Sequence, residues 1–301
     1  MNDQVWVVGE VLIDLIPDRD QHLAVVGGGP ANTAKAAAKL GVETYFIDGI
    51  SNDEYGKMAK AELLSANVLL DYAQYSNKPT CTATVTLSSS GSASYEFVIE
   101  DTATFDFSDL WLPDPQRLMP SLLHIGTLAT VIEPGASVLF KWAQSFAYVA
   151  PIIFDPNIRP AVLCDRVEYV RKVEKWVAIS SAVKVSDEDL NWLYPGKSID
   201  EIVKNWLEVG VELVVVTLGD IGITAYRKNE QISVGAVKVV VADTVGAGDT
   251  VGAVLVEAIV NNGLDKLTGE VLKRMLNRAV KAAAITVSRT GANPPSKEEI
   301  D

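Results

Sequence analysis

The most informative stretch of this chain is VADTVGAGDT, residues 241–250. It runs from an apolar strand through two glycines into a helix that we expect over 248–262. Glycines let a backbone approach a ligand closely, and the free N–H groups at a helix start favour a phosphate. A carboxylate there opposes phosphate binding unless it has a separate task, and Asp249 could accept the proton of an attacking hydroxyl. The alternative interpretation is a plain turn in which Asp249 caps the helix.

Outward from this stretch, strands and helices alternate along most of the chain. The pattern predicts an α/β protein with a mostly parallel sheet covered by helices on both faces. The expected strands are 5–8, 11–16, 22–26, 44–50, 122–125, 152–154, 182–185, 213–217, 225–227 and 237–241, and the expected helices are 31–40, 56–66, 135–147, 167–176, 199–209, 248–262 and 268–287. A Thr-rich hairpin, with strands at 82–87 and 95–99 and a loop at 88–92, interrupts the alternation and predicts a small appended sheet.

Composition and charge exclude several classes of protein. The 301 residues are 48% hydrophobic and 22% charged, which is typical of a globular chain, and no apolar run approaches the ~18 residues of a membrane span. The net charge of −13 opposes nucleic-acid binding. Cys81 and Cys164 form no CxxC pair, and the N-terminus shows no secretory signal, so we expect unpaired core thiols and a cytoplasmic location without membrane contact.

Four further segments place polar residues beside glycines or after strands. They are Gly27–Asn32, Gly9–Asp14, Asp155–Arg159 and Thr217–Gly222. Ligands of open α/β sheets bind beyond the carboxyl ends of the strands, so Asp14 and Asn32 could hold ligand hydroxyls and Arg159 could neutralise phosphate charge. A turn, or a carboxylate paired with a surface cation, explains each segment equally well when it is taken alone.

Two other enzyme classes find little support. The spacing after Gly246 and Gly248 places the next glycine one residue late for the dinucleotide fingerprint, which disfavours an NAD(P)-dependent dehydrogenase. His22 and His124 are the only histidines, which removes most multi-histidine metal sites, and no Gly-x-Ser-x-Gly elbow supports a Ser-His-Asp triad. His124 lies in an apolar run and is predicted to be a packed strand residue.

Two of these segments together resemble the signatures of the ribokinase-like (PfkB) carbohydrate kinases. Residues 243–249 are similar to the C-terminal signature and residues 27–32 to the N-terminal one, in the expected order along essentially the whole chain. The sequences at 9–14 and 155–159 are most similar to the fructokinase branch. The resemblance implies a three-layer α/β/α sandwich over residues 1–301, with a small β-sheet lid formed by about 11–26 and 72–105.

The resemblance also implies an activity and a role for each residue. Members use ATP and Mg²⁺ to phosphorylate a sugar or nucleoside hydroxyl, so we expect a phosphotransferase acting on a monosaccharide, with fructose as the first candidate. Asp249 would be the base, and Arg159 would face the phosphate or the sugar. The other implied contacts are the anion hole at Gly246, Ala247 and Gly248, the sugar site at Asp14, Gly28, Gly29 and Asn32, the nucleotide site at Thr217, Gly219, Gly222, Gly246 and Gly248, adenine at Asn277, and K⁺ near Asp243.

Two departures from the family pattern bear on the metal and the substrate. The family's Asn-x-x-Glu motif aligns with Ser186 and Asp189, so Asp189 would take the Glu position near Mg²⁺. Glu100 appears where many fructokinases carry arginine in a lid strand, which favours another sugar or a sugar acid. The open alternatives are a 2-keto-3-deoxygluconate kinase, a nucleoside kinase, and a non-catalytic sugar- or nucleotide-binding protein. Because exposed sheet edges invite pairing, we also expect a homodimer through the lid.

Overall fold

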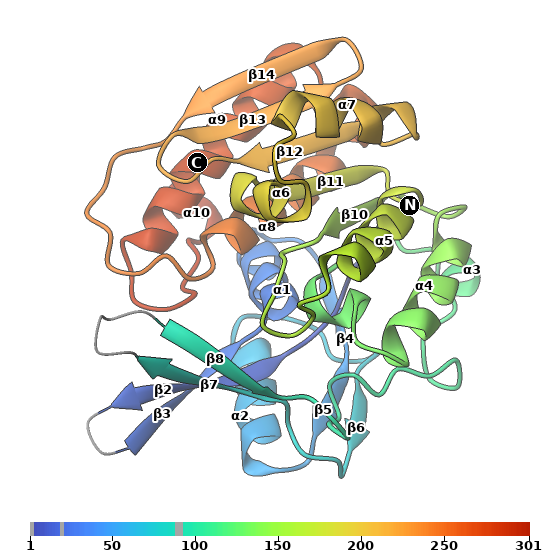
Figure 1. Cartoon of the computed structure of the whole chain (residues 1–301), viewed down its shortest axis with the longest axis vertical. Helices are drawn as coiled ribbons and strands as arrows, with labels where there is room; N and C mark the ends of the chain where they lie inside the picture. Colours follow the sequence, from blue (N-terminus) through green and yellow to red (C-terminus); the bar gives the residue numbers. More distant parts are fainter. Residues whose placement is uncertain (1–2, 19–20, 88–92) are drawn as a thin grey trace.

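The larger sheet of the computed structural model has eight strands and runs through the centre of the molecule (Figure 1). The structure describes residues 3–18, 21–87 and 93–301. The strand order is β14-β13-β12-β11-β10-β9-β1-β4, parallel from β12 to β4 and antiparallel at β13 and β14. The strands are β1 Val5–Val8, β4 Thr44–Ile47, β9 Leu122–Gly126, β10 Ile152–Asp155, β11 Ala182–Ser186, β12 Leu213–Thr217, β13 Gly222–Arg227 and β14 Glu230–Gly235.

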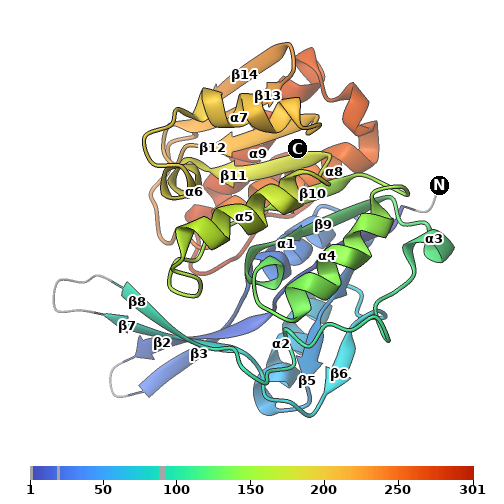
Figure 2. The ribbon, with the colours of Figure 1, turned by 45° about the vertical axis from the view of Figure 1, so that its right-hand side comes forward.

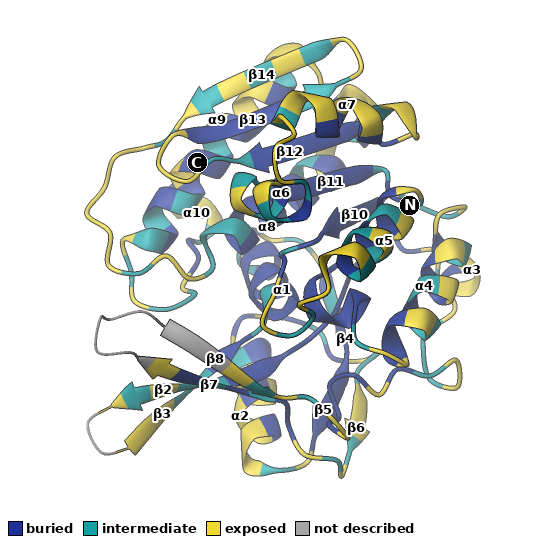
Figure 3. Ribbon diagram, viewed as in Figure 1, coloured by how far each residue is buried: buried dark blue, intermediate teal, exposed yellow. Residues whose placement is uncertain are grey.

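Helices cover both faces of this sheet, which confirms the three-layer prediction. Alternate residues of β1 enter different cores: Val5 and Val7 lie in the core shared with the helices at 29–39, 247–262 and 269–287, and Trp6 and Val8 in the core shared with those at 135–146, 166–177, 187–193 and 199–208. Strands buried on both faces must be apolar throughout, which explains the near-continuous Val, Ile and Leu runs (Figure 3). The helices are α1 Gly29–Lys39, α2 Glu54–Ser65, α3 Pro115–Leu118, α4 Gly135–Phe146, α5 Arg166–Val177, α6 Asp187–Leu193, α7 Ile199–Glu208, α8 Ala247–Asn262, α9 Gly269–Val287 and α10 Lys297–Ile300, with 3₁₀ turns η1 Thr127–Thr130 and η2 Leu264–Lys266.

A smaller four-stranded sheet projects from one end of the molecule (Figure 2). Its order is β3-β2-β7-β8, with bounds β3 Gln21–Gly27, β2 Leu12–Asp18, β7 Thr82–Leu87 and β8 Ala93–Val98. Asp14 pairs in register with Ala83, and Ala83 pairs with Phe97, so these three side chains share one face. The predicted small sheet is therefore confirmed, while the predicted loop 88–92 lies outside the described residues. A two-stranded sheet, β5 Gly49–Ser51 with β6 Gln74–Ser76, lies beside it.

Two strand predictions were wrong. Residues 237–241 form no strand, although valines alternate with polar residues there; Val240 is 89% exposed, and the strand that pairs with β13 is β14 instead. The apolar run 44–50 is broken at Asp48, whose buried carboxylate accepts hydrogen bonds from the amides of Val11 and Gly49. A side chain that satisfies its neighbours' amides competes with a continuous strand ladder, so β4 and β5 are separate elements.

Three smaller expectations also have outcomes. His124 is a buried strand residue in β9, as predicted. Both cysteines are unpaired, but only Cys81 is buried; Cys164 is exposed, so the prediction of two core thiols was wrong for it. Within residues 3–18, 21–87 and 93–301, no helix combines the length and apolar character needed to cross a bilayer.

Candidate active site

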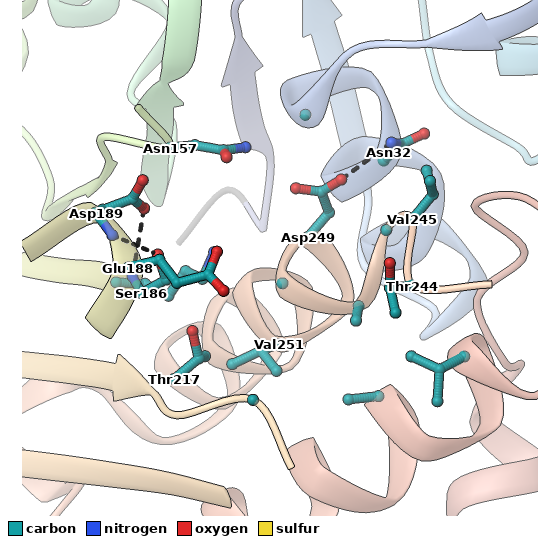
Figure 4. A pocket seen from close by; sticks show the side chains of 18 of the residues that line it. Asn32, Asn157, Ser186, Glu188, Asp189, Thr217, Thr244, Val245, Asp249 and Val251 are labelled. Atoms are coloured by element: carbon teal, nitrogen blue, oxygen red, sulfur yellow. Dashed lines mark hydrogen bonds between the residues drawn. The ribbon is translucent and has the colours of Figure 1, made fainter. Parts of the chain in front are cut away.

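A cavity of about 1240 Å³ opens beyond the carboxyl ends of the parallel strands, where the small sheet faces the start of α8. It brings together residues from segments distant in the sequence (Figure 4). The predicted site residues that line it are Asp14, Gly28, Gly29, Asn32, Arg159, Asp189, Thr217, Gly219, Gly222, Gly246, Ala247, Gly248 and Asp249. The cavity therefore unites the glycine-rich turns with the polar strand ends.

Asp249 lies in the first turn of α8 and is 7% exposed. Its Oδ2 accepts a hydrogen bond from Nδ2 of Asn32 at 3.0 Å, while Oδ1 of Asn32 is buried with no partner in the structure (Figure 4). Burial raises the pKa of Asp249 to about 6, although the nearby Lys184 ammonium lowers it. A carboxylate with a pKa close to neutrality beside a helix N-terminus can accept a proton at physiological pH.

The turns that build the site need glycine for steric reasons. Gly246 precedes α8 in the left-handed region, with φ 79°, and a Cβ there would lie 2.8 Å from the Ala292 side chain. At Gly29 a Cβ would lie 2.9 Å from both the Asn157 amide nitrogen and the Thr127 methyl carbon. Both turns are thus packed so closely that the helix starts can approach a ligand only with glycine at these positions.

One end of the cavity is rich in carboxylates. Asp14 lies against Gly27, where a Cβ would be 2.2 Å from its Oδ2, and burial raises the pKa of Asp14 to about 6. Glu10 is 3% exposed, accepts hydrogen bonds from the Thr127 hydroxyl and the Ala129 amide, and has its pKa raised by burial to about 7. Acceptors of this kind match a ligand that presents several hydroxyl donors.

Arg159 extends into the same region from the loop after β10. Its Nη1 donates to Oδ1 of Asn157 at 2.7 Å, and its positive charge lowers the pKa of Asp14, Glu10 and Asp249. Asn157 itself has φ 41°, a left-handed conformation that is uncommon outside glycine, and its side chain faces Asn32 and Asp249 across the cavity (Figure 4). Strained residues of this kind concentrate at functional sites.

The other end of the cavity is more apolar. Thr217, Gly219 and Gly222 line it, as predicted, and so does the exposed segment around Val237 and Val239. Helix α9 contributes Val280, Ala283, Ala284 and Val287. Asn277 does not line the cavity: it is exposed and donates its amide to the Lys273 carbonyl oxygen. The structure therefore does not bring Asn277 together with the other predicted site residues; Val280, three residues later on α9, lines the cavity.

Asp189 has a structural task that the sequence did not reveal. It forms a capping box with Ser186 at the start of α6, and its Oδ1 accepts the amide of Ile158 at 2.9 Å. Burial raises its pKa. Glu188, which is exposed, lines the cavity beside it (Figure 4). Asp189 thus tethers the loop that carries Asn157 and Arg159, and Glu188 and Asp187 present carboxylates to the cavity.

Two other expectations concern residues outside the cavity lining. Asp243 does not line it; its Oδ1 accepts the Val245 amide at 3.0 Å and its Oδ2 accepts the Gly291 amide at 2.9 Å, so it fixes the turn before α8. Glu100 is exposed in a turn after β8, and the residue of that strand that lines the cavity is Phe97. The predicted place of Glu100 in a lid strand was therefore wrong, and its carboxylate does not line the cavity.

Lys184 was not among the site residues predicted from the sequence. It lies on β11 opposite Asp155, is 4% exposed, and donates from Nζ to Oδ2 of Asp155 at 2.9 Å. A lysine inside the apolar strand 182–185 was the available signal, since buried lysines are almost always paired. Its partner, Asp155, could not be predicted, because the sequence of one strand does not show which residue of a neighbouring parallel strand lies opposite it.

A buried carboxylate beside a glycine turn and a helix N-terminus fits an enzyme that transfers a phosphoryl group to a hydroxyl group. The family model for pfkB family carbohydrate kinases matches residues 2–299. The chain belongs to this family.

Individual relatives support the fructokinase branch. The chain is 35% identical to a fructokinase of Rhizobium leguminosarum bv. trifolii over 251 residues, 81% of this chain and 76% of the relative, and 28% identical to a fructokinase of Klebsiella pneumoniae over 100% and 99%. A Vibrio cholerae O395 fructokinase double mutant, solved with fructose, ADP and potassium ion, has a TM-score of 0.85 at 26% identity over 96% and 94%. An ATP-bound Xylella fastidiosa fructokinase matches in fold, with a TM-score of 0.92 at 22% identity over 100% and 97%.

Proposed function

We propose that the chain is an ATP-dependent fructokinase that transfers the γ-phosphate of ATP to a hydroxyl of fructose, with Asp249 as the base. The observation that carries this proposal is the buried Asn32–Asp249 pair, which lines the cavity together with Asp14, Glu10 and the glycine turn before α8. A neutral polyol suits the end formed by Asp14, Glu10 and Asn32, because it brings hydroxyl donors and no negative charge. The fructokinase relatives, and fructose in the Vibrio structure, support the choice of sugar.

The arrangement suggests how these residues act. Asp14 and Asn32 orient the sugar, so that one hydroxyl lies beside Asp249. Asp249 takes the hydroxyl proton as the oxygen bonds to the γ-phosphorus and the bond to the bridging oxygen of ADP breaks. The first-turn N–H groups of α8 and the Arg159 guanidinium stabilise the negative charge on the transferred group. Catalysis then comes from positioning and electrostatics, without a covalent intermediate.

The nucleotide and the ions would use the other parts of the site. We place adenine against Val280, Ala283 and Ala284, and the phosphates between Thr217 and Gly248. Asp187 and Glu188 fit Mg²⁺, which commonly takes one or two carboxylates together with substrate phosphates and neutralises phosphate charge when bound. K⁺ near the turn fixed by Asp243 remains part of the proposal, supported by the potassium ion in the Vibrio structure. We also propose a cytoplasmic location, where ATP is available to the enzyme.

Coupled ADP release with Mg-ATP and a substrate panel tests this function. The panel contains D-fructose, other hexoses, ribose, 2-keto-3-deoxygluconate, adenosine and inosine. We expect fructose-dependent turnover with the highest kcat/KM. Preference for 2-keto-3-deoxygluconate or a nucleoside would reassign the substrate within the family. ATP binding without turnover of any panel member would instead favour a non-catalytic binding protein.

The rate should fall in acid. Asp249 and Asp14 must both be ionised, and burial raises the pKa of each to about 6. We therefore expect kcat/KM for fructose to rise with pH through about 6 and to level above it, in a profile measured from pH 5 to 8.5. The control is Asp14→Asn, which should keep an acid limb near pH 6 at a lower rate. If kcat/KM of Asp14→Asn no longer falls below pH 6, the fall in the wild type belongs to Asp14, which would contradict Asp249 as the titrating base.

We further propose that the small sheet serves as a lid and forms a homodimer interface. Ile16 and Leu23 pair in register on the face that carries Asp14, and they are 40% and 57% exposed. A second copy that covered them would also help to exclude water from the sugar site. Sedimentation velocity at micromolar concentration should show a dimer that Leu23→Asp dissociates. The control is Val209→Asp, at an exposed valine outside the small sheet, which should leave the dimer intact. A monomeric wild type would contradict the interface.

A further inference from the structure

Lys184 occupies the sheet directly beneath the start of α8. A Cβ added at Gly248 would lie 2.9 Å from its Nζ, so the ammonium lies against the anion-binding turn, and Lys184 itself lines the cavity. The same Nζ is held by Asp155, whose other oxygen, Oδ1, is buried without a partner in the structure. The side chains of Lys184 and Asp155 are only 5% and 2% exposed. The ion pair is therefore a fixed part of the floor of the site.

Three carboxylates on three different elements surround Lys184. Asp155 on β10, Asp249 on α8 and Asp189 on α6 all raise the pKa of Lys184 against the opposing effect of burial, and the pKa is raised overall. His124 on β9 also interacts with Lys184; burial and the Lys184 charge lower its pKa to about 3, so it is neutral. Lys184 consequently stays protonated, and it is the second-largest influence on Asp249, after desolvation.

Stability alone does not account for a buried pair at this position. The desolvation of two ions often cancels their attraction, and well-packed apolar side chains are commonly as stable or more stable. An apolar residue would also continue the pattern of Val183 and Val185 on the same strand. A lysine whose Nζ touches Gly248 is explained better by a task at the site.

We propose that Lys184 is a positioning residue for phosphoryl transfer: anchored by Asp155, its ammonium ion supports the turn at Gly248 and holds Asp249 in its ionised form. This inference rests on the proposed function. The Lys184 ammonium would act through two groups that meet the substrates: the backbone amides of the turn and the carboxylate of Asp249. Removal of the ammonium should therefore affect the chemical step and the ionisation of Asp249 more than the binding of sugar, which depends on Asp14 and Asn32.

Three variants test this role: Lys184→Met, Lys184→Arg, and the double variant Lys184→Met with Asp155→Asn. We expect Lys184→Met to lower kcat by about 10²-fold, a loss typical of a lost preorganised charge, with KM for the sugar within about threefold. Lys184→Arg keeps the charge and should recover part of the rate. The double variant leaves no unpaired carboxylate, so it should fold with wild-type circular dichroism and still show the low kcat.

A second measurement does not depend on turnover. The titration of Asp249 in the free protein is followed by ¹³C NMR of carboxyl-labelled aspartate, assigned with Asp249→Asn. In Lys184→Met the midpoint should move upward by about one pH unit or more, because an opposite charge has been removed. An unchanged midpoint, or a folded variant with kcat within threefold of wild type, would overturn the proposal. If the wild type turns over no substrate, the proposed function fails, and the NMR midpoint alone decides the role of Lys184.

Discussion

Replacement of Asp249 by asparagine should lower kcat with fructose and ATP by about 10³-fold, because the proposed base is removed while the shape of the side chain is kept. Asn32 can still donate to the remaining amide oxygen, so the local hydrogen bond survives. Binding of both substrates should change little, since the carboxylate acts on the proton that leaves in the transition state. Steady-state ADP release gives kcat, and calorimetric titration with ATP gives the binding constant.

The same substitution should stabilise the free protein. Burial raises the pKa of Asp249 from 3.8 to about 6, so the folded state binds the proton more tightly than the unfolded state. Between these values the stability contributed by the protonated form is lost as the pH rises, and above about pH 6 the buried charge destabilises the fold. An uncharged asparagine removes this penalty, which is up to about 3 kcal/mol at pH 8 and absent near pH 3. Urea denaturation at both pH values measures the difference.

A control and a contradicting result are available for this prediction. Asp265→Asn, at an exposed position in η2, should leave both kcat and the unfolding free energy unchanged. If Asp249→Asn retains more than a tenth of the wild-type kcat, another group must take the proton. Glu10, which also lines the cavity, would then be the next candidate.

Replacement of Asp14 by alanine should lower kcat/KM for the sugar by about 10²-fold, mainly through a higher KM. A carboxylate that accepts two hydroxyl hydrogen bonds contributes roughly 3 kcal/mol, since each bond to a charged group contributes about 1.5 kcal/mol or more. Its position against Gly27 fixes the carboxylate toward the cavity, so no other side chain of β2 can replace it. KM for ATP should stay within about twofold, because the nucleotide end of the cavity is formed by other elements.

Asp18→Ala is the matched control for Asp14→Ala. Asp18 lies on the same strand, is exposed and does not line the cavity, so its loss should leave kcat/KM unchanged. Asp14→Asn keeps one acceptor oxygen and should fall between alanine and wild type. Equal KM values for the sugar in wild type and Asp14→Ala would remove Asp14 from the sugar site and weaken the assignment of that end of the cavity.

The local features of the site could be predicted because they depend on short-range chemistry. The turn at 246–249 needs glycine before a helix start, and a carboxylate placed there needs a reason, whatever the rest of the chain does. The alternation of strands and helices likewise predicted the layers. The cavity-facing side of α9 was harder to predict. Asn277 and Val280 are separated by less than a helical turn, and periodicity alone did not show which of them faces the cavity.

Contacts between residues on different strands could not be predicted from the sequence. Lys184 meets Asp155 only because β10 and β11 are neighbours in one particular register. The segment 237–241 has the alternation of a strand, yet β13 already has β14 as its partner, and Val237, Val239 and Val241 line the cavity instead. Glu100 was misread for a related reason: the register of β7 and β8 decides that Phe97 faces the cavity.

The Asn32–Asp249 hydrogen bond joins residues 217 positions apart, and this separation has a consequence for the chain as it leaves the ribosome. At roughly 5 to 20 residues per second, α1 waits roughly 10 to 40 s before α8 is made. During that interval the growing chain holds the strands of the proposed sugar site but has neither the glycine turn at 246–248 nor Asp249, the proposed base. Nascent chains that end before α8 should therefore be unable to hydrolyse ATP, because the proposed activity needs both segments.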